Sequence, residues 1–305
     1  MKGRILKGIG GFYYVHAEDG KVYECRARGL FRKDGIKPLT GDEVTMECVQ
    51  DNEKDAGNII SLLPRRNELI RPAAANVDQA VIIFSLGYPE PDLTLLDKFL
   101  ILMGTEDVQC VIAFNKNDMS SKEQNNALKT AYERSGCRVL FMSARTGEGL
   151  EGFRNCLEKK TSVLAGPSGV GKSSIVNRLW PAANMETGEL SRKTGRGKNT
   201  TRHTEVFALG NDTYILDTPG FTSLSVDFLE PGELRLYYPE FMPFMGECRF
   251  RGCTHVTEPG CRVRQAVEER EVHPARYESY VSIYRDLDSE ESRRKRDRIK
   301  RSHQS

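Results

Sequence analysis

No apolar run in this sequence of 305 residues is long enough to cross a membrane, and the first residues lack the apolar stretch of a signal peptide. Neither sign of charge is in excess, because 45 basic and 43 acidic side chains leave a formal net charge of +2. Binding to nucleic acid would therefore depend on local basic patches. We expect a cytoplasmic monomer with no membrane partner, long enough for two or three domains.

A disulfide pattern is missing as well. Five of the eight cysteines are scattered, which is typical of a reducing compartment, whereas Cys248, Cys253 and Cys261 cluster around His255. Three thiolates and one imidazole suit tetrahedral Zn²⁺, and a closed set of four ligands suits a structural site. Because the spacing is not the commonest one for zinc, chance clustering of reduced cysteines beside a solvated histidine stays an alternative.

Residues 1–72 are predicted to form an all-β domain. Short alternating runs at 11–16 and 21–26 are joined through Asp19-Gly20, a hairpin signal, and further runs follow at 42–48 and 57–63. The pattern fits an OB-fold-like barrel, a common oligonucleotide-binding architecture, with 64–72 as a linker. Its aromatic and basic side chains either contact RNA or pack the core beside solvated charges. They are Phe12, Tyr13, Tyr14, Arg26, Arg28, Phe31, Arg32 and Lys33.

Residues 73–226 change to alternating strands and helices, which predicts an α/β domain with a parallel sheet. The predicted strands are 77–84, 108–114, 138–142, 161–165, 205–209 and 213–216, and the predicted helices are 93–103, 121–134, 150–159 and one that begins at Ser174. Two further helices are expected at 263–271 and 275–285, inside a C-terminal region 227–305 that ends in a basic tail.

The strand at 161–165 runs into a full match to the phosphate-binding pattern G-x-x-x-x-G-K-[ST], followed by a helix. Glycines allow backbone N–H groups to turn toward a polyphosphate, Lys172 would reach the β- and γ-phosphates, and the Ser173 hydroxyl would hold Mg²⁺. The alternative is a glycine-rich turn with a surface lysine. The predicted phosphate-binding residues are Gly166, Pro167, Ser168, Gly169, Val170, Gly171, Lys172, Ser173 and Ser174.

A second motif lies upstream, where residues 115–118 resemble the N-K-x-D signature that selects guanine. The carboxylate of Asp118 can accept from N1–H and the 2-amino group of guanine, and the aliphatic stem of Lys116 can lie along the base. Asp118 could instead only cap the following helix. The predicted base-binding residues are Asn115, Lys116, Asn117, Asp118 and the companion pair Ser143 and Ala144, whose backbone N–H meets the guanine O6.

Downstream of the phosphate-binding pattern, residues 184–202 predict a long loop that ends in Asn199-Thr200-Thr201. A threonine hydroxyl and carbonyl there could complete Mg²⁺ coordination when the γ-phosphate is present, as in a nucleotide switch. Asp217-Thr218-Pro219-Gly220 resembles the D-x-x-G element, with Asp217 near Mg²⁺ and the Gly220 N–H facing the γ-phosphate. A plain turn is the alternative.

Ordinary GTPases begin with the phosphate loop and end with N-K-x-D and S-A, whereas here these two elements come first. The chain therefore looks like a circularly permuted GTPase between a barrel at 1–72 and a zinc-binding helical domain at 227–305. Together these features resemble the ribosome small subunit-dependent GTPase A family of bacteria. The resemblance implies GTP hydrolysis stimulated by the small ribosomal subunit, a role in its late maturation, and rRNA contacts by all three domains. It also implies catalytic roles for Lys172, Thr200, Thr201 and the residue before them.

That residue is a departure from the family. Members often carry a histidine immediately before the paired threonines, where this sequence has Asn199, and Phe221 follows D-x-x-G. An amide can orient water but cannot take its proton, so we expect slow intrinsic hydrolysis that depends on the ribosome; His203 could substitute. Two alternatives remain: an rRNA-binding factor timed by its nucleotide with negligible turnover, and a permuted GTPase of the large subunit. An ATP-using kinase is disfavoured by Asp118.

Overall fold

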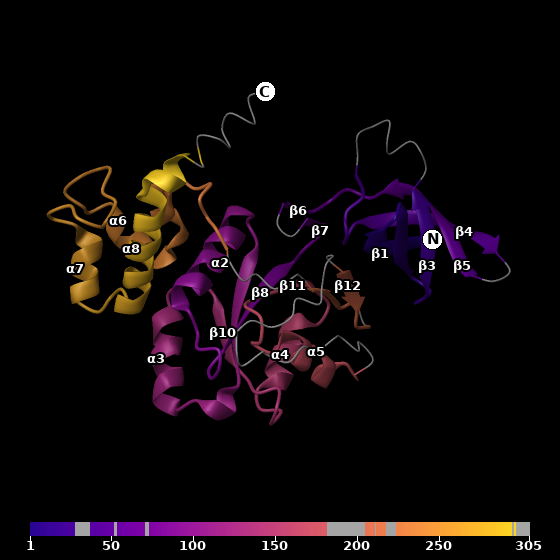
Figure 1. The fold of residues 1–305 in the computed structure, drawn as a ribbon, viewed down its shortest axis with the longest axis horizontal. Coiled ribbons are helices and arrows are strands. Elements are labelled where there is room, and N and C mark those ends of the chain that lie inside the picture. The colour runs from indigo at the N-terminus through magenta and orange to yellow at the C-terminus, as the bar shows by residue number, and fades with distance from the viewer. Residues whose placement is uncertain are drawn as a thin grey trace. The chain divides into compact units, whose positions relative to one another are not determined.

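The computed structural model describes residues 1–27, 37–51, 54–70, 73–181, 205–210, 212–217, 224–294 and 296 (Figure 1). The chain divides into two compact units. One comprises Met1–Val81 and Gly149–Phe221, and the other Ile82–Glu148 and Thr222–Ser305. Among the described residues, no helix is both long and apolar enough to span a bilayer.

The N-terminal domain is a closed barrel of five strands in the order β1-β2-β3-β5-β4, in which β1 also pairs with β4 and β3 runs parallel to β5. This order is that of an OB-fold and confirms the predicted barrel. The strands are β1 (Lys2–Ile9), β2 (Phe12–Ala17), β3 (Val22–Ala27), β4 (Glu43–Asp51) and β5 (Lys54–Leu62). Alternate side chains fill the interior, among them Ile5, Val15, Cys25, Met46 and Ile59.

Strand β1 was not located from the sequence, because five of its eight residues are glycine or basic and its alternation is weak. The segment predicted as a linker is also more ordered than expected. It contains β6 (Glu68–Leu69), which pairs with β7 (Ala74–Ala75), and Arg65 donates to the fully buried Asp42 at 2.7 Å. This charged pair fixes the end of the barrel to the segment that follows it.

The first unit also joins the barrel to the first residues of two strands of the central domain. Arg4 of β1 lies over the ring of Tyr214 at 4.4 Å, pairs with Glu43 at 2.6 Å and donates to the Thr161 hydroxyl. His16 of β2 lies 3.2 Å from the Tyr214 hydroxyl through Nδ1. Thr161 begins the strand that leads to the phosphate loop, and Tyr214 begins the strand that leads to Asp217.

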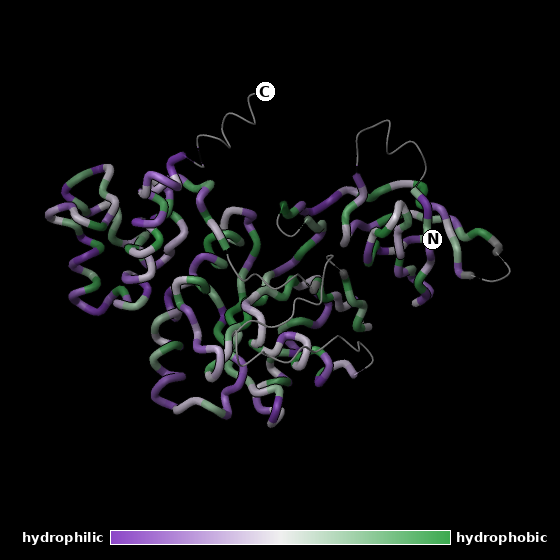
Figure 2. The backbone as a smooth tube through the Cα atoms, viewed as in Figure 1, coloured by the Kyte–Doolittle hydropathy of each residue, from purple (hydrophilic) through white to green (hydrophobic). Residues whose placement is uncertain are grey.

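The central sheet has six strands in the order β10-β9-β8-β11-β13-β12. Pairs β9–β10 and β11–β13 are parallel, and β12 is antiparallel to β13. Every residue of β8 and β11 is buried, as expected for strands covered on both faces, and the tube in Figure 2 is largely green there. The strands are β8 (Gln79–Ser85), β9 (Gln109–Asn115), β10 (Arg138–Phe141), β11 (Thr161–Ala165), β12 (Glu205–Ala208) and β13 (Tyr214–Asp217).

All four predicted helices of this domain are present, with ends that differ by a few residues. Asp92 caps α2 by accepting from the Leu95 N–H at 2.9 Å, and Ser121 caps α3 by accepting from the Gln124 N–H at 3.2 Å. The helices are α2 (Leu93–Thr105), α3 (Lys122–Tyr132), α4 (Leu150–Leu157) and α5 (Lys172–Leu179).

The C-terminal region packs around stacked and edge-on aromatic rings of Tyr238, Phe241 and Tyr280, whose centroids lie 4.9–5.1 Å apart. The two predicted helices are α7 (Arg262–Glu268) and α8 (Pro274–Asp288). Three short elements precede them and were not predicted, because two begin at proline and none is long enough to show helical periodicity. They are η3 (Pro231–Tyr237), η4 (Pro239–Phe241) and α6 (Met242–Met245).

Candidate nucleotide-binding loops and zinc centre

The predicted phosphate loop lies between β11 and α5, as the sequence pattern requires. Gly166, Gly169 and Gly171 have φ angles of 139°, 80° and 96°, a region that side chains disfavour. These conformations allow the loop to curl ahead of the helix N-terminus, where N–H groups without intrahelical partners attract anions.

Lys172 begins α5, and its ammonium group folds back onto the loop. Its Nζ donates to the carbonyl oxygens of Gly166 and Pro167 at 2.8 and 2.9 Å. The cation is therefore held over the loop that the sequence assigns to the phosphates. Phosphate oxygens carry more charge than carbonyl oxygens, so they would be the stronger acceptors for this ammonium group.

The structure describes only some of the predicted switch residues. Asp217 ends β13, where its backbone pairs in register with Leu164 of β11 and Glu205 of β12. Asn199, Thr200, Thr201, His203, Gly220 and Phe221 lie outside the described residues, so their predicted roles stay predictions.

In the second unit, the predicted guanine loop leaves the end of β9 and is fastened to the loop after β10. Asn115 is buried, and its Oδ1 accepts from the Ala144 N–H at 3.0 Å. Asn117, the variable position of the motif, accepts from Asn125 of α3 at 2.6 Å and donates to Glu148 at 3.0 Å. Asn115 thus ties the two loops together, and Asn117 adds a structural role that the motif does not specify.

Lys116 adopts the left-handed conformation, with a φ of 64°, and its Nζ donates to the Tyr88 carbonyl oxygen. Burial lowers the pKa of Lys116, and the nearby charge of Asp118 opposes that shift. Its stem is therefore held in one direction along the loop, which is the arrangement needed to lie against a base.

Asp118 is the residue to which the sequence assigns guanine recognition, and two side chains bind its carboxylate. The buried Ser143 hydroxyl donates to Oδ1, and the Arg145 guanidinium lies 2.6 Å from Oδ2. The Ser143 hydrogen bond chiefly, with a smaller contribution from Arg145, holds the pKa of Asp118 below its usual range. The carboxylate is therefore ionised and oriented at neutral pH. Arg145 was missed from the sequence, although it directly follows the Ser-Ala pair.

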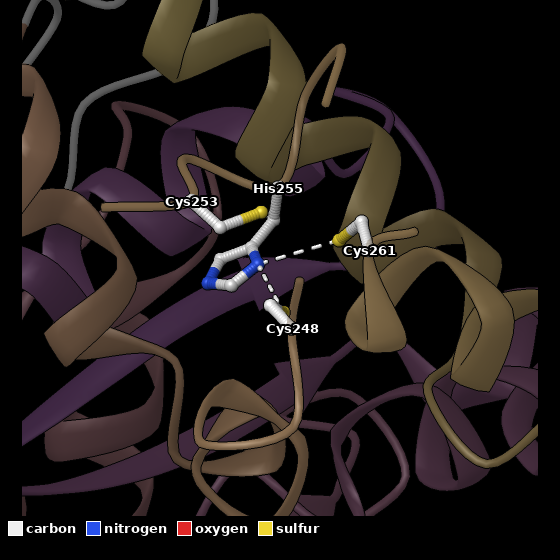
Figure 3. Close-up of side chains that lie close together, drawn as sticks. All are labelled: Cys248, Cys253, His255 and Cys261. Carbon is white, nitrogen blue, oxygen red and sulfur yellow. Dashed lines mark hydrogen bonds between the residues drawn. The ribbon is translucent and has the colours of Figure 1, made fainter. Parts of the chain in front are cut away.

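In the C-terminal region, the four predicted zinc ligands converge from loops that adjoin α6 and α7 (Figure 3). Their ligand atoms all lie within 4.8 Å of one another. His255 Nδ1 lies 3.6 Å from Cys248 Sγ and 3.4 Å from Cys261 Sγ. Tetrahedral zinc with ordinary bond lengths would separate a nitrogen and a sulfur ligand by about 3.6 Å. The donor set and its spacing therefore fit Zn²⁺.

The surroundings of these four side chains favour metal binding. His255 is fully buried with a φ of 63°, and burial lowers its pKa to about 4, which keeps the imidazole neutral. Its Nε2 is buried without a hydrogen-bond partner in the described part of the chain. Glu258 accepts from the Thr254 N–H at 2.6 Å and from the Thr254 hydroxyl at 2.7 Å, which fixes the loop between the ligands.

Basic side chains beside the zinc ligands and on the barrel are only partly available to a ligand. Arg262 is occupied by Glu247, Glu269 and Glu271, whereas Arg249 is exposed. On the barrel, Tyr13 packs against the core, while Phe12 and Tyr14 point to the opposite face of β2. Arg26 lies over the Phe12 ring at 5.0 Å, and Lys7 lies over the Tyr14 ring at 5.1 Å. Arg28, Phe31, Arg32 and Lys33 lie outside the described residues.

Comparisons with known proteins agree with this architecture. A family model described as RsgA GTPase matches residues 62–227, and the RsgA N-terminal domain model matches residues 2–57. The crystal structure of YloQ, described as a circularly permuted GTPase, is 36% identical, with a TM-score of 0.74 and 94% of each chain covered. YjeQ from Thermotoga maritima is 32% identical, with a TM-score of 0.76, 94% of this chain and 98% of that chain covered.

Two curated relatives extend the likeness over nearly the whole chain. The small ribosomal subunit biogenesis GTPase RsgA of Agathobacter rectalis is 46% identical, covering 94% of this chain and 98% of that protein. The protein of the same name from Caldanaerobacter subterraneus is 46% identical, covering 96% and 98%. The fold and motif order thus define a circularly permuted GTPase, an enzyme that acts on GTP. Within that class, the chain belongs to the RsgA family.

Proposed function

We propose that this chain hydrolyses GTP on the small ribosomal subunit and acts late in the maturation of that subunit. The observation that carries the nucleotide part is the ionised Asp118, held by Ser143 in the guanine loop, in a chain that also carries Lys172 over a phosphate loop. The subunit is supported by the names of the relatives from Agathobacter rectalis and Caldanaerobacter subterraneus.

The nucleotide contacts follow from the chemistry of each loop. Lys172 binds the β- and γ-phosphate oxygens, with backbone N–H groups of residues 166–174 around the polyphosphate. Asp118 accepts from the guanine edge, Lys116 lies along the base, and the loop after β10 supplies the Ala144 N–H to O6. That N–H is bonded to Asn115 in this structure, so the base oxygen would share it.

Mg²⁺ belongs at the phosphate end of the site, where Ser173 and Asp217 would hold it and where it would neutralise charge on the β- and γ-phosphates. Thr200 and Thr201 supply a hydroxyl and a carbonyl oxygen when the γ-phosphate is present, and the Gly220 N–H faces that phosphate. Asn199 orients the attacking water but takes no proton. Turnover is therefore slow until the ribosomal subunit orders this loop.

The zinc centre is structural in this proposal. Cys248, Cys253, His255 and Cys261 would hold zinc as a closed set of four ligands that leaves no position for substrate, and the bound metal would crosslink the loops that carry them. The crosslink holds the loop that carries Arg249 against the aromatic core of the C-terminal region. Exposed arginine on a rigid loop suits contact with RNA phosphates.

A second rRNA contact is proposed on the barrel, where Phe12 and Tyr14 share one face with Arg26 and Lys7. Aromatic rings beside cations can stack on unpaired bases and neutralise phosphates together. We take residues 1–72, 73–226 and 227–305 as the RNA-binding, GTPase and zinc-binding domains of a monomer that works in the cytoplasm with the small subunit as its partner.

The test is phosphate release from GTP by the purified protein, alone and with purified small or large ribosomal subunits. We expect slow release alone and strong stimulation by small subunits only, with ATP unable to compete for the site. Stimulation by large subunits instead would show that the protein acts on the large subunit. Binding to small subunits without stimulation would make it an RNA-binding factor timed by its nucleotide. In a companion variant, Asn199→His should raise the basal rate; an unchanged rate would show that position 199 is not limiting.

A further inference from the structure

The carboxylate that would bind guanine is held by two side chains of the neighbouring loop, the one after β10. Ser143 reaches Asp118 Oδ1 from the interior, because Ser143 is fully buried. Arg145 pairs with the other carboxylate oxygen, Oδ2, and its side chain is 77% exposed whereas that of Asp118 is 10% exposed. The partner of Oδ2 is therefore a solvent-exposed side chain, which a base could displace without disturbing the buried Ser143.

Arginine has the donor chemistry of the ligand itself. The edge of guanine that binds a carboxylate consists of N1–H and the 2-amino group on either side of C2, which is a guanidine unit within the ring. The guanidinium of Arg145 presents N–H donors in the same planar fork, and carboxylates accept such pairs side by side. Adenine has no equivalent pair of donors at this edge.

From this geometry we propose that Arg145 is an internal surrogate for guanine, which binds Asp118 while the site is empty and is displaced when the base arrives. The inference rests on the proposed function, because it takes Asp118 as the ligand of the base. No other ion pair of Arg145 is found among the described residues, so its release breaks a single ion pair. Lys116 and Asn115, by contrast, are fastened to neighbouring loops and stay in place.

The size of the effect follows from the exposure of Arg145, whose side chain is 77% exposed. Exposed ion pairs change an equilibrium by about 1.5- to 5-fold, and the guanine nucleotide has to overcome this competition on binding. Removing Arg145 should therefore tighten guanine binding by that factor and speed association. The loss of one positive charge also weakens the general attraction of the anionic nucleotide, which acts in the opposite direction, so the experiment needs a control that shares this second effect.

A double-mutant cycle through Asp118 provides the control. Asp118→Asn replaces one acceptor by an N–H donor, which matches xanthine, a base with an oxygen in place of the 2-amino group. An amide forms no ion pair with Arg145, yet the nucleotide phosphates are unchanged. Binding of fluorescent GDP to the Asp118 forms and of fluorescent XDP to the Asp118→Asn forms is measured with and without Arg145→Ala. Arg145→Lys keeps the charge but not the fork, and circular dichroism checks folding.

We expect Arg145→Ala to tighten GDP binding about 1.5- to 5-fold relative to its effect on XDP binding, with Arg145→Lys in between. Equal effects in both arms would overturn the inference. So would a relative loss of GDP affinity, which would mean that Arg145 positions Asp118 or contacts the nucleotide. If Asp118→Asn fails to exchange GDP for XDP, the assignment of Asp118 itself fails; if the exchange occurs without coupling, only the surrogate role fails.

Discussion

Arg276 of α8 offers a demanding test of how the second unit is held together. Its side chain is 2% exposed and pairs with two buried carboxylates, Asp97 of α2 and Glu240 of η4, the latter at 2.6 Å. Its guanidinium also lies over the rings of Tyr132 and Tyr238, at 5.0 and 4.5 Å. One cation therefore joins the GTPase helices α2 and α3 to the C-terminal region.

Arg276→Ala should destabilise this unit by about 3–5 kcal/mol, because it leaves two buried carboxylates without their cation. The loss should depend on pH. Burial raises the pKa of Asp97 above its usual value, and the charge of Arg276 opposes that shift. Without Arg276 the pKa of Asp97 rises further, so the cost of ionising Asp97 in the folded state grows as pH rises above the unfolded value of 3.8. The deficit of the variant should therefore be smaller at pH 5 than at pH 8.

Hydrogen exchange in increasing urea, followed by mass spectrometry, can measure the stability of α2, α3 and α8 separately from the rest. The fluorescence of the single tryptophan, Trp180, follows the unfolding of the first unit and serves as an internal control. A matched variant is Lys98→Ala, which removes the exposed 3.0 Å pair between Lys98 and Asp286 on the same two helices. That change should cost less than about 1 kcal/mol.

A loss below about 1 kcal/mol for Arg276→Ala would contradict the reasoning, since the buried network would then behave like a surface pair. A loss of the expected size that does not change with pH would also contradict it. In that case missing packing against the tyrosine rings, rather than unpaired carboxylates, would be the cause. Arg276→Lys further separates the effect of unpaired carboxylates from that of lost packing, because lysine keeps the charge but lacks the planar guanidinium.

Three further outcomes are expected. Cys261→Ser should reduce bound zinc well below one ion per chain, measured by elemental analysis, and expose the C-terminal region to proteolysis; full zinc content would exclude Cys261 as a ligand. Lys172→Ala should weaken GTP binding about 10- to 100-fold, with the unfolding midpoint of the nucleotide-free protein nearly unchanged. For Glu258, burial favours a higher pKa, but the donors of Thr254 outweigh it and lower the pKa from 4.5 to about 2. Its ionised form therefore stabilises the fold above pH 4.5 and less as pH falls toward 2, so the deficit of Glu258→Gln in urea unfolding should shrink over that interval; a constant deficit would contradict this reasoning.

Local signals predicted most of this molecule. The strands and helices of the central domain follow from apolar runs and caps within a few residues, such as Ser121 before α3. Cys248 and Cys261 lie close in the chain, so their convergence needs little loop closure. The observed ends of the helices and strands differ from the predicted ends by a few residues, because the periodicity fades there. Strand β1 was missed because Ile5 is nearly its only buried apolar side chain.

Pairings between distant parts of the chain could not be predicted. Arg276 is separated from Asp97 by 179 positions, and only the packing of α8 against α2 brings them together. A buried arginine is rare enough that sequence reasoning places it on the surface. The contact of Arg4 with Tyr214 is of the same kind, since it depends on how the barrel meets β13.

By itself, the sequence determined the class of protein, because phosphate and base recognition depend on short motifs whose residue types and order are visible in one dimension. The tertiary structure decided which side chains those residues contact. Arg145 lies two residues after Ser143, yet only the folded arrangement of the loops after β9 and β10 shows that its guanidinium binds Asp118. The physical reason is that a motif specifies backbone shape and donor chemistry, whereas the direction of an exposed side chain is set by neighbours that the fold brings within reach.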